Sequence, residues 1–538
     1  MKLEKLFYNG NFISVDKEKN IYNMLGVIDG KITYLSKNND FMRVEASEKI
    51  DMKGRTILPG FIDSHLHTLD YAEQKKAVNL SGTTSVMEII DRCKKHYHEK
   101  GLQQGWLIGK GWNQNNFTDG NDFIYKKDLD TISTEFPIVL LRTCVHMAVA
   151  NSKAIEMILK SEDGQRLKEY IEIENGILKE GAVAIYKKLF EKINLSYIKE
   201  LILEAHKDFL KAGITTVHSA DLFSAVPEEE WELLIEAYKE LEKENKLNVK
   251  TYEQCMFFNY ENFEKFSQVG YTTGQGSRYF KIGPLKLIAD GSLGARTAYM
   301  KEPYSDDKNT KGILILNEEK MEKFIKLAKE RNMQLAIHAI GDGSAEIAVD
   351  LLNKYNKDKN IMRDGIVHAQ ILNNSILDKM KKGNITAYIQ PVFIDTDMDI
   401  VEKRIGKERT KTSYAWKTML DMGLHLSGGS DAPVVDFNVM ENIYFAVTRK
   451  NIKGEPQIGW YPEQNLTLDE AIELFTIKGA YHSFEEKEKG SLELGKYADM
   501  VVIDKNIYKV SSEEIKNIKV LETIVEGKSF FKIDEVII

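Results

Sequence analysis

The sequence predicts an α/β protein, a (β/α)₈ barrel with a small β-sandwich built from both termini and a subdomain inserted after the first barrel strand. Three observations predict this fold. Apolar β-type segments alternate with helical patterns through the middle of the chain, short strands with tight-turn dipeptides occur at both ends, and one gap between strands is very long. Short, continuously apolar strands separated by helices are typical of parallel strands that are buried on both faces.

Both ends of the chain are rich in short strands. Near the N-terminus, apolar runs are separated by Asn9-Gly10 and Asp29-Gly30, which are typical hairpin-turn dipeptides. The C-terminal end is similar, with Glu526-Gly527 between its last two strands. We therefore predict that residues 1–56 and 487–538 form one composite β-sandwich, and the alternative is a pair of unrelated hairpins.

The barrel is predicted over residues 57–486. Its strands are expected at 56–62, 214–218, 249–257, 282–288, 334–338, 365–368, 385–390 and 424–427. Helical patterns lie between most of these strands, for example at 319–331 and 343–355, and another at 468–477 follows the last one. Roughly 150 residues separate the first two strands, far more than a βα connection needs. We therefore expect an inserted subdomain at about residues 70–200.

Composition and charge exclude several classes of protein. The net charge of −8 gives no electrostatic reason to bind nucleic acid or an anionic membrane. No apolar run approaches the roughly 20 residues of a membrane span, and the N-terminus has no signal-peptide pattern. The three cysteines are too far apart for a disulfide framework. We expect a cytoplasmic enzyme with a small-molecule substrate. A homodimer is the oligomeric state that we expect by default.

Histidines and an aspartate occur where predicted strands end, which is where the active site of such a barrel lies. His65 and His67 close the first strand, and because they are two residues apart on an extended chain they can hold one metal together. His338 closes the fifth strand and His368 the sixth, while Asp431 follows the eighth. A single strand-end histidine is more often structural than catalytic, but the joint placement of these residues predicts a metal centre.

Longer motifs resemble those of the amidohydrolase superfamily, over nearly the whole chain. Residues 58–67 are similar to the opening motif of the superfamily and residues 490–502 to its closing motif. More narrowly, three segments resemble the YtcJ-like (type 3) amidohydrolases: 286–298, 338–342 and 429–433.

This resemblance implies roles for the five residues. His65, His67 and Asp431 would hold the more buried metal, and His338 with His368 would hold a second one. Such a metal lowers the pKa of a bound water and polarises the substrate carbonyl. Asp431 would accept a proton from the water and then pass it to the leaving group.

Two further ligands are implied less directly. Lys286 occupies the place where some relatives carry a carboxylated lysine that bridges two metals. A protonated ammonium cannot ligate, whereas a carbamate would supply two oxygens; the alternative is that Lys286 pairs with a carboxylate such as Asp290. Glu180 resembles a recurrent acidic position of the branch and is a reserve ligand, unless it is a surface glutamate.

Five residues are candidates for substrate binding, and three of them have a structural alternative. His218 ends the second strand and either contacts substrate or makes a structural hydrogen bond. His146 matches a branch-typical histidine of the insertion and is expected to line the pocket, and Trp112 there is either a pocket wall or core. Arg296 and Tyr304 follow the fourth strand, where the guanidinium could bind a substrate carboxylate or form a loop salt bridge.

We conclude that the sequence predicts hydrolysis of an amide-type C–N bond in a small molecule with one or two divalent metals. Zinc is the default because histidine and aspartate suit it, while iron and manganese are compatible. The alternatives are a deaminase, esterase or isomerase on the same site, and a barrel kept for binding or regulation. The intact metal-binding set argues against a non-catalytic barrel.

Overall fold

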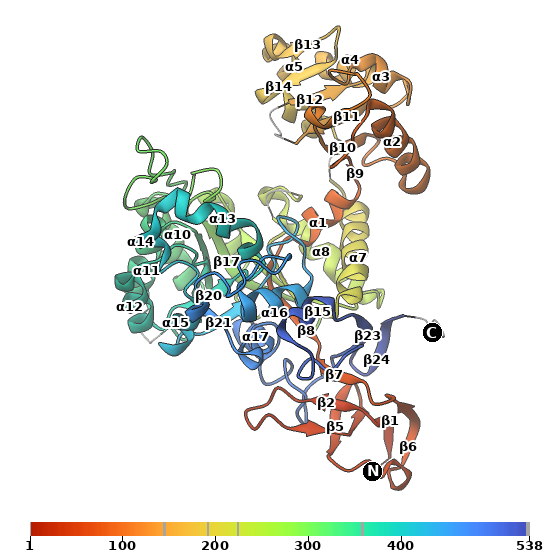
Figure 1. Cartoon of the computed structure of the whole chain (residues 1–538), viewed down its shortest axis with the longest axis vertical. Coiled ribbons are helices and arrows are strands. Elements are labelled where there is room, and N and C mark those ends of the chain that lie inside the picture. The colour runs from red at the N-terminus through yellow and green to blue at the C-terminus, as the bar shows by residue number, and fades with distance from the viewer. Residues whose placement is uncertain (1, 144–146, 191–192, 223–224, 357–359, 534–538) are drawn as a thin grey trace. The chain divides into compact units, whose positions relative to one another are not determined.

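An eight-stranded parallel sheet lies in the larger of two units into which the chain divides. The computed structural model describes residues 2–143, 147–190, 193–222, 225–356 and 360–533. The larger unit consists of Met1–Thr68 and Ile202–Ile538, and the smaller one of Leu69–Leu201 (Figure 1).

The parallel strands follow one another in chain order around the barrel. They are β8 (Phe61–Leu66), β15 (Ile214–Ser219), β16 (Lys250–Met256), β17 (Phe280–Ile288), β18 (Leu335–Ala339), β19 (Gly365–His368), β20 (Thr386–Ile389) and β21 (Leu426–Gly428). Between the first and last strands, Asp431 N donates to His65 O at 2.7 Å and His67 N to Ala432 O at 2.8 Å. These bonds close the ring, so the predicted barrel is confirmed.

The first barrel strand begins later than predicted. Residues 56–62 comprise one whole strand and the start of another: β7 (Thr56–Pro59) belongs to a terminal sheet, and β8 belongs to the barrel. Gly60 lies between them, and a Cβ there would come within 2.4 Å of the Thr215 side chain. Because β8 extends to Leu66, His65 lies inside a strand that was predicted to end before it.

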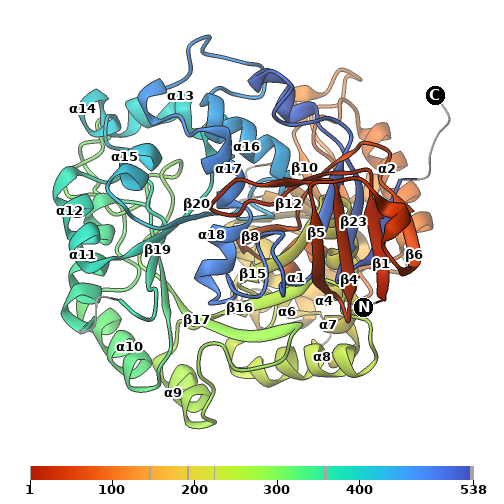
Figure 2. The same ribbon diagram turned by 90° about the horizontal axis from the view of Figure 1, so that it is seen from below.

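Helices lie on the outer side of the strands, as α9 to α12 show in Figure 2. Those of the larger unit that follow β15 to β21 are α8 (Trp231–Lys243), α9 (Tyr260–Gln268), α10 (Glu318–Glu330), α11 (Asp342–Tyr355), α12 (Asn374–Gly383), α13 (Phe393–Ile405), α14 (Lys407–Thr410), α15 (Trp416–Asp421), α16 (Val439–Thr448), α17 (Leu468–Leu474) and α18 (Ile477–His482). In α10, Asn317 caps the first turn by accepting from Lys320 N, and the buried face includes Met321, Phe324 and Ala328. The helix predicted at 468–477 is present as α17 but ends at Leu474, and α18 begins at Ile477 because the backbone of Thr476 leaves the helical region.

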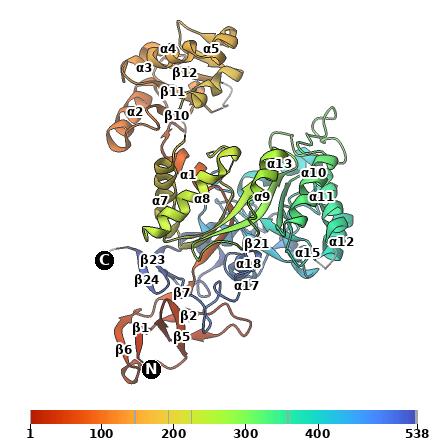
Figure 3. The ribbon, with the colours of Figure 1, turned by 180° about the vertical axis from the view of Figure 1, so that it is seen from behind.

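The two ends of the chain form two further sheets, of which the first contains N-terminal strands alone and the second contains strands from both ends. One has the order β5-β4-β1-β6 and the other β24-β23-β22-β7-β2-β3, in which red and blue strands lie side by side (Figure 3). Their bounds are β1 (Leu3–Tyr8), β2 (Asn11–Ile13), β3 (Ile21–Tyr22), β4 (Met24–Ile28), β5 (Lys31–Ser36), β6 (Ala46–Asp51), β22 (Met500–Ile503), β23 (Val520–Val525) and β24 (Lys528–Lys532). One hydrophobic cluster, including Phe7, Leu25, Ile57, Val502 and Ile524, joins the two sheets.

Two of the three predicted hairpin turns are present. Asp29-Gly30 joins β4 to β5 with φ of 50° and 72°, and Glu526-Gly527 joins β23 to β24 with φ of 51° and 72°. Positive φ at both central residues matches the right-handed twist of the paired strands. The prediction for Asn9-Gly10 is wrong, because β1 and β2 on either side of it belong to different sheets.

The smaller unit is built around a mixed sheet of its own, with order β13-β14-β12-β11-β10-β9. Its strands are β9 (Val78–Asn79), β10 (Leu107–Trp112), β11 (Ile138–Arg142), β12 (Met147–Ala150), β13 (Ile171–Glu172) and β14 (Ile177–Lys179). Along β11, Ile138 and Leu140 join one hydrophobic cluster while Val139 and Leu141 join another. Both faces of this sheet are therefore covered, as alternation along a strand requires. Among the described residues, no helix is long and apolar enough to cross a membrane.

Candidate metal centre

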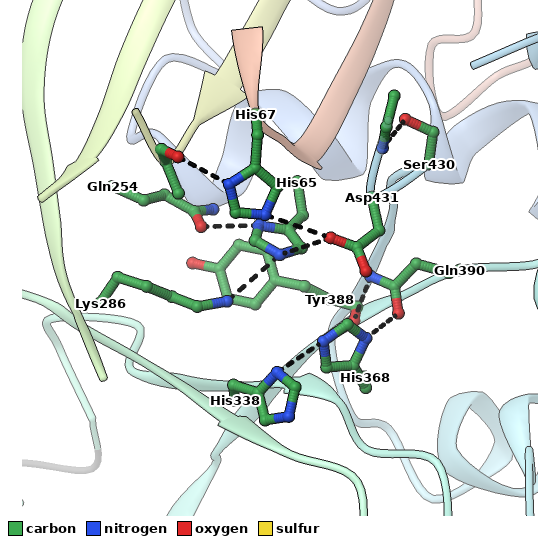
Figure 4. A network of polar contacts seen from close by, with 12 residues as sticks. His65, His67, Gln254, Lys286, His338, His368, Tyr388, Gln390, Ser430 and Asp431 are labelled. Carbon is green, nitrogen blue, oxygen red and sulfur yellow. Dashed lines mark hydrogen bonds and ion pairs between the residues drawn. The ribbon is translucent and has the colours of Figure 1, made fainter. Parts of the chain in front are cut away.

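The predicted ligands come together at one end of the barrel because parallel strands bring their carboxyl ends to the same edge. His65 lies on β8 and His67 just after it, and Asp431 follows β21. His338 lies on β18, and His368 ends β19. Figure 4 shows these side chains turned toward one another.

His65, His67 and Asp431 form the centre of the group. One ligand atom from each lies within 4.8 Å of the others. Asp431 Oδ1 is 3.3 Å from His65 Nε2 and 3.4 Å from His67 Nε2. His65 is fully buried, and this burial, together with the nearby Lys286 charge, lowers the pKa of its imidazole to about 3. The imidazole is therefore neutral and has a lone pair available for a metal.

The hydrogen bond on the far side of each ring determines which of the two ring nitrogens can bind a metal. His67 Nδ1 lies 2.7 Å from Ala220 O, which can only accept, so Nδ1 carries a proton and Nε2 is the nitrogen that can bind a metal. His65 Nδ1 likewise lies 2.8 Å from Gln254 Oε1. Both Nε2 atoms face the carboxylate of Asp431. Facing acceptors repel one another unless a cation lies between them, and the donor set therefore fits a divalent metal.

The second pair of histidines has the same character. His338 Nε2 lies 3.2 Å from Gly291 O, which leaves the lone pair on Nδ1. His368 Nδ1 lies 2.8 Å from Gln390 Oε1, which leaves the lone pair on Nε2. His338 Nδ1 and His368 Nε2 are 2.9 Å apart. This pair of nitrogens fits a shared cation.

Lys286, on β17, is fully buried and lies beside the first pair of histidines. Its Nζ is 3.2 Å from His65 Nε2, and burial lowers the pKa of the ammonium to about 7. The alternative pairing with Asp290 is wrong. Asp290 instead accepts from Gly341 N at 2.8 Å and from Ser344 Oγ at 2.7 Å.

Two of the predicted ligands have strained backbones. The φ angles of His368 and Asp431 are 73° and 64°, and Ala369 follows His368 with 46°. Left-handed conformations at residues other than glycine cost about 1–3 kcal/mol each and cluster at functional sites. The surrounding structure therefore holds both ligands in conformations that an isolated chain would avoid.

Gln254 and Gln390 contact the ligand histidines and were not predicted. Gln254 lies on β16, and Gln390 directly follows β20. The available signal was a polar residue at or near the carboxyl end of an otherwise apolar barrel strand. Such a position alone does not identify the partner, which for Gln254 is 189 residues away in sequence.

Two substrate-binding predictions near β17 are corrected. The Arg296 guanidinium donates to both oxygens of Asp306, at 3.1 and 2.9 Å, so the fork proposed for a substrate carboxylate is occupied by a loop salt bridge. Tyr304 is fully buried and its hydroxyl donates to Ala298 O at 2.8 Å. Both side chains stabilise the loop in which they lie.

The remaining predicted residues differ in their surroundings. Trp112 is core of the smaller unit, where its indole N–H donates to Leu140 O at 2.9 Å. His218 is fully buried against Tyr252, and neither ring nitrogen has a hydrogen-bond partner among the described residues, so the predicted structural hydrogen bond is absent there. Glu180, also in the smaller unit, stays a predicted reserve ligand. His146 lies outside the described residues.

Comparison with known proteins agrees with this centre. The model of the amidohydrolase family matches residues 48–531. A putative amidohydrolase, YtcJ of Bacillus subtilis, is 30% identical over 544 residues, which cover 98% of this chain and 99% of that protein. The N-substituted formamide deformylase of Arthrobacter pascens is 22% identical over 548 residues, 97% of each. The crystal structure of an uncharacterized metal-dependent hydrolase from Pyrococcus furiosus superposes with a TM-score of 0.78 at 26% identity, and the match covers 93% of this chain and 99% of that one. The chain therefore belongs to the amidohydrolase family.

Proposed function

We propose that the protein hydrolyses an amide-type C–N bond of a small molecule at a divalent metal centre held by His65, His67 and Asp431. The observation that carries this proposal is the grouping of His65, His67 and Asp431, in which one ligand atom from each residue lies within 4.8 Å of the others. Similarity over 97% of the chain to a formamide deformylase supports a carbon–nitrogen bond as the target.

Zinc is the metal that we propose for this centre. Neutral imidazole and carboxylate ligands suit zinc, and they are also compatible with iron and manganese. A second metal would be held by His338 and His368. A carbamate on Lys286 would bridge the two metals, and the lowered pKa of this lysine supports that step because carbon dioxide reacts with the neutral amine.

The bound metal would supply Lewis acidity toward the substrate carbonyl and toward water. Asp431 would accept the proton that the attacking water loses. The same carboxyl group would then deliver this proton to the leaving nitrogen, acting first as a general base and then as a general acid. The acceptors behind His65 and His67 would keep both rings oriented during the cycle.

The test is metal analysis of the purified protein combined with a panel of N-formyl and N-acyl amines, aminopurines and esters. We expect wild-type protein to contain stoichiometric metal and to hydrolyse an amide of the panel. His65→Ala should lose metal and reduce kcat/KM by more than the roughly 100-fold that loss of an outer partner of a ligand costs. His98→Ala, at an exposed histidine of the smaller unit, is the matched control and should change neither. Metal-free, fully folded wild-type protein would contradict the proposal, as would activity on esters or aminopurines alone.

A further inference from the structure

Two buried glutamines contact the ligand histidines on the side away from the metal centre. Gln254 is fully buried and its Oε1 lies 2.8 Å from His65 Nδ1. Gln390 is 3% exposed and its Oε1 lies 2.8 Å from His368 Nδ1. Figure 4 shows both contacts.

The orientation of each amide is determined by its second hydrogen bond. Gln254 Nε2 donates to Ser64 O at 3.1 Å, and Gln390 Nε2 donates to Tyr388 O at 3.1 Å. A backbone carbonyl can only accept, so a flipped amide would place oxygen against oxygen. The Oε1 atoms therefore face the imidazoles, and Nδ1 of each ring must carry the proton.

The other two histidines are oriented by backbone carbonyl oxygens: Ala220 O contacts His67, and Gly291 O contacts His338. Each half of the centre thus contains one histidine oriented by backbone and one oriented by a side-chain amide. A glutamine orients the ring without adding negative charge. A carboxylate in its place would add a second buried charge near Asp431, at a large desolvation cost.

We propose that Gln254 and Gln390 are positioning residues that hold His65 and His368 in the Nδ1–H tautomer and thereby set the metal affinity of the centre. Gln254 acts on the metal of His65, His67 and Asp431, and Gln390 acts on the metal of His338 and His368. This inference rests on the proposed metal-dependent function. Without the amide, the ring can rotate or carry its proton on Nε2, where the proton blocks coordination.

The experiment measures metal content per chain and dissociation constants by chelator competition for Gln254→Met and Gln390→Met. Methionine retains the length and volume of glutamine but supplies no carbonyl acceptor. We expect affinity to fall roughly 10- to 100-fold, for the first metal in Gln254→Met and for the second in Gln390→Met. In Gln254→Glu and Gln390→Glu, burial favours the protonated carboxyl group, which can donate to the backbone carbonyl and accept from the imidazole as the amide does, so these variants should retain most of the wild-type affinity.

Gln334→Met is the matched control. Gln334 is another fully buried glutamine of the barrel, where it accepts from Tyr252 Oη at 2.9 Å and donates to Arg363 O at 2.9 Å. These partners do not include the five predicted ligands, so its loss should lower thermal stability while metal affinity stays unchanged.

The outcomes separate this inference from the proposed function. Wild-type protein that binds no metal overturns both. Metal-binding wild type with unaffected Met variants overturns the inference alone, as does an equal loss in Gln334→Met. If the Glu variants lose as much affinity as the Met variants, an acceptor is not what the site requires, and the tautomer role is overturned.

Discussion

Each of the four predicted ligand histidines has a hydrogen-bond acceptor beside one of its ring nitrogens. Ala220 O, Gly291 O and the two glutamine carbonyls each accept the proton of the non-ligating nitrogen. Burial removes the competing water and, at His65, keeps the ring neutral. At the scale of single residues, metal binding at this centre is therefore expected to depend on which ring nitrogen carries the proton as well as on which residues are present.

The first prediction concerns Lys286. If its amine forms a bridging carbamate, metal binding should depend on carbon dioxide. We expect wild-type protein reconstituted with bicarbonate to bind two metals per chain, and Lys286→Met to bind fewer under the same conditions. Metal counting after reconstitution, with a parallel series in solutions free of carbon dioxide, checks this. Equal metal content in both proteins and both series would show that Lys286 has no part in binding.

At the scale of elements, the loop after β21 depends on a close backbone approach. Gly429 lies against β8, and a Cβ there would come within 2.6 Å of His65 N and 3.0 Å of His65 O. These are backbone atoms and cannot rotate away. The loop that supplies Asp431 can therefore hydrogen bond to His65 only because this residue is glycine.

Gly429→Ala should accordingly displace Asp431 and weaken metal binding. We expect a loss of about 1–3 kcal/mol of stability from overpacking, together with a lower metal affinity. Thermal unfolding and chelator competition are the measurements. Gly294→Ala is the matched control, since the nearest atom to its Cβ is Ile400 Cδ1 at 3.8 Å, and it should leave metal affinity unchanged. Wild-type affinity in Gly429→Ala would contradict this account of the loop.

At the scale of the whole molecule, buried ion pairs connect the barrel to the segment that returns to the terminal sheets. Glu485 contacts Lys281 of β17 and Lys489, both at 2.7 Å. Burial alone would raise the pKa of Glu485, but the two lysines outweigh it and lower that pKa to about 2. The ionised carboxylate is therefore held more strongly in the folded protein than in the unfolded chain.

This difference predicts a loss of stability in acid. A carboxyl group with a lowered folded pKa stabilises the protein above its ordinary value of 4.5 and loses that contribution as the pH falls toward about 2. The contribution is on the order of 3 kcal/mol at neutral pH. Glu485→Gln should be less stable at pH 7, and its stability should depend less on pH between 4.5 and 2. Denaturant unfolding across this range checks the difference, and parallel curves for the two proteins would contradict it.

The sequence by itself determined the parts of the site that depend on local pattern. Strand ends can be read from apolar runs, and parallel strands place those ends together, so His65, His67, His338, His368 and Asp431 could be predicted to meet. The tight turns at Asp29-Gly30 and Glu526-Gly527 are equally local, because glycine accepts positive φ at the position where the hairpin requires it.

Only the tertiary structure decided which distant groups become partners. Asn9-Gly10 has the pattern of a hairpin turn, yet its flanking strands pair with strands elsewhere in the terminal sheets. Arg296 was predicted to bind a substrate carboxylate, but its guanidinium forms a salt bridge with Asp306. Lys286 contacts His65, 221 residues away, instead of the nearby Asp290. Hydrogen bonds and burial depend on neighbours that are close in space and not in sequence. The contacts that orient the histidines, such as that of Gln254 with His65, therefore could not be predicted from the sequence and are seen only in the folded structure.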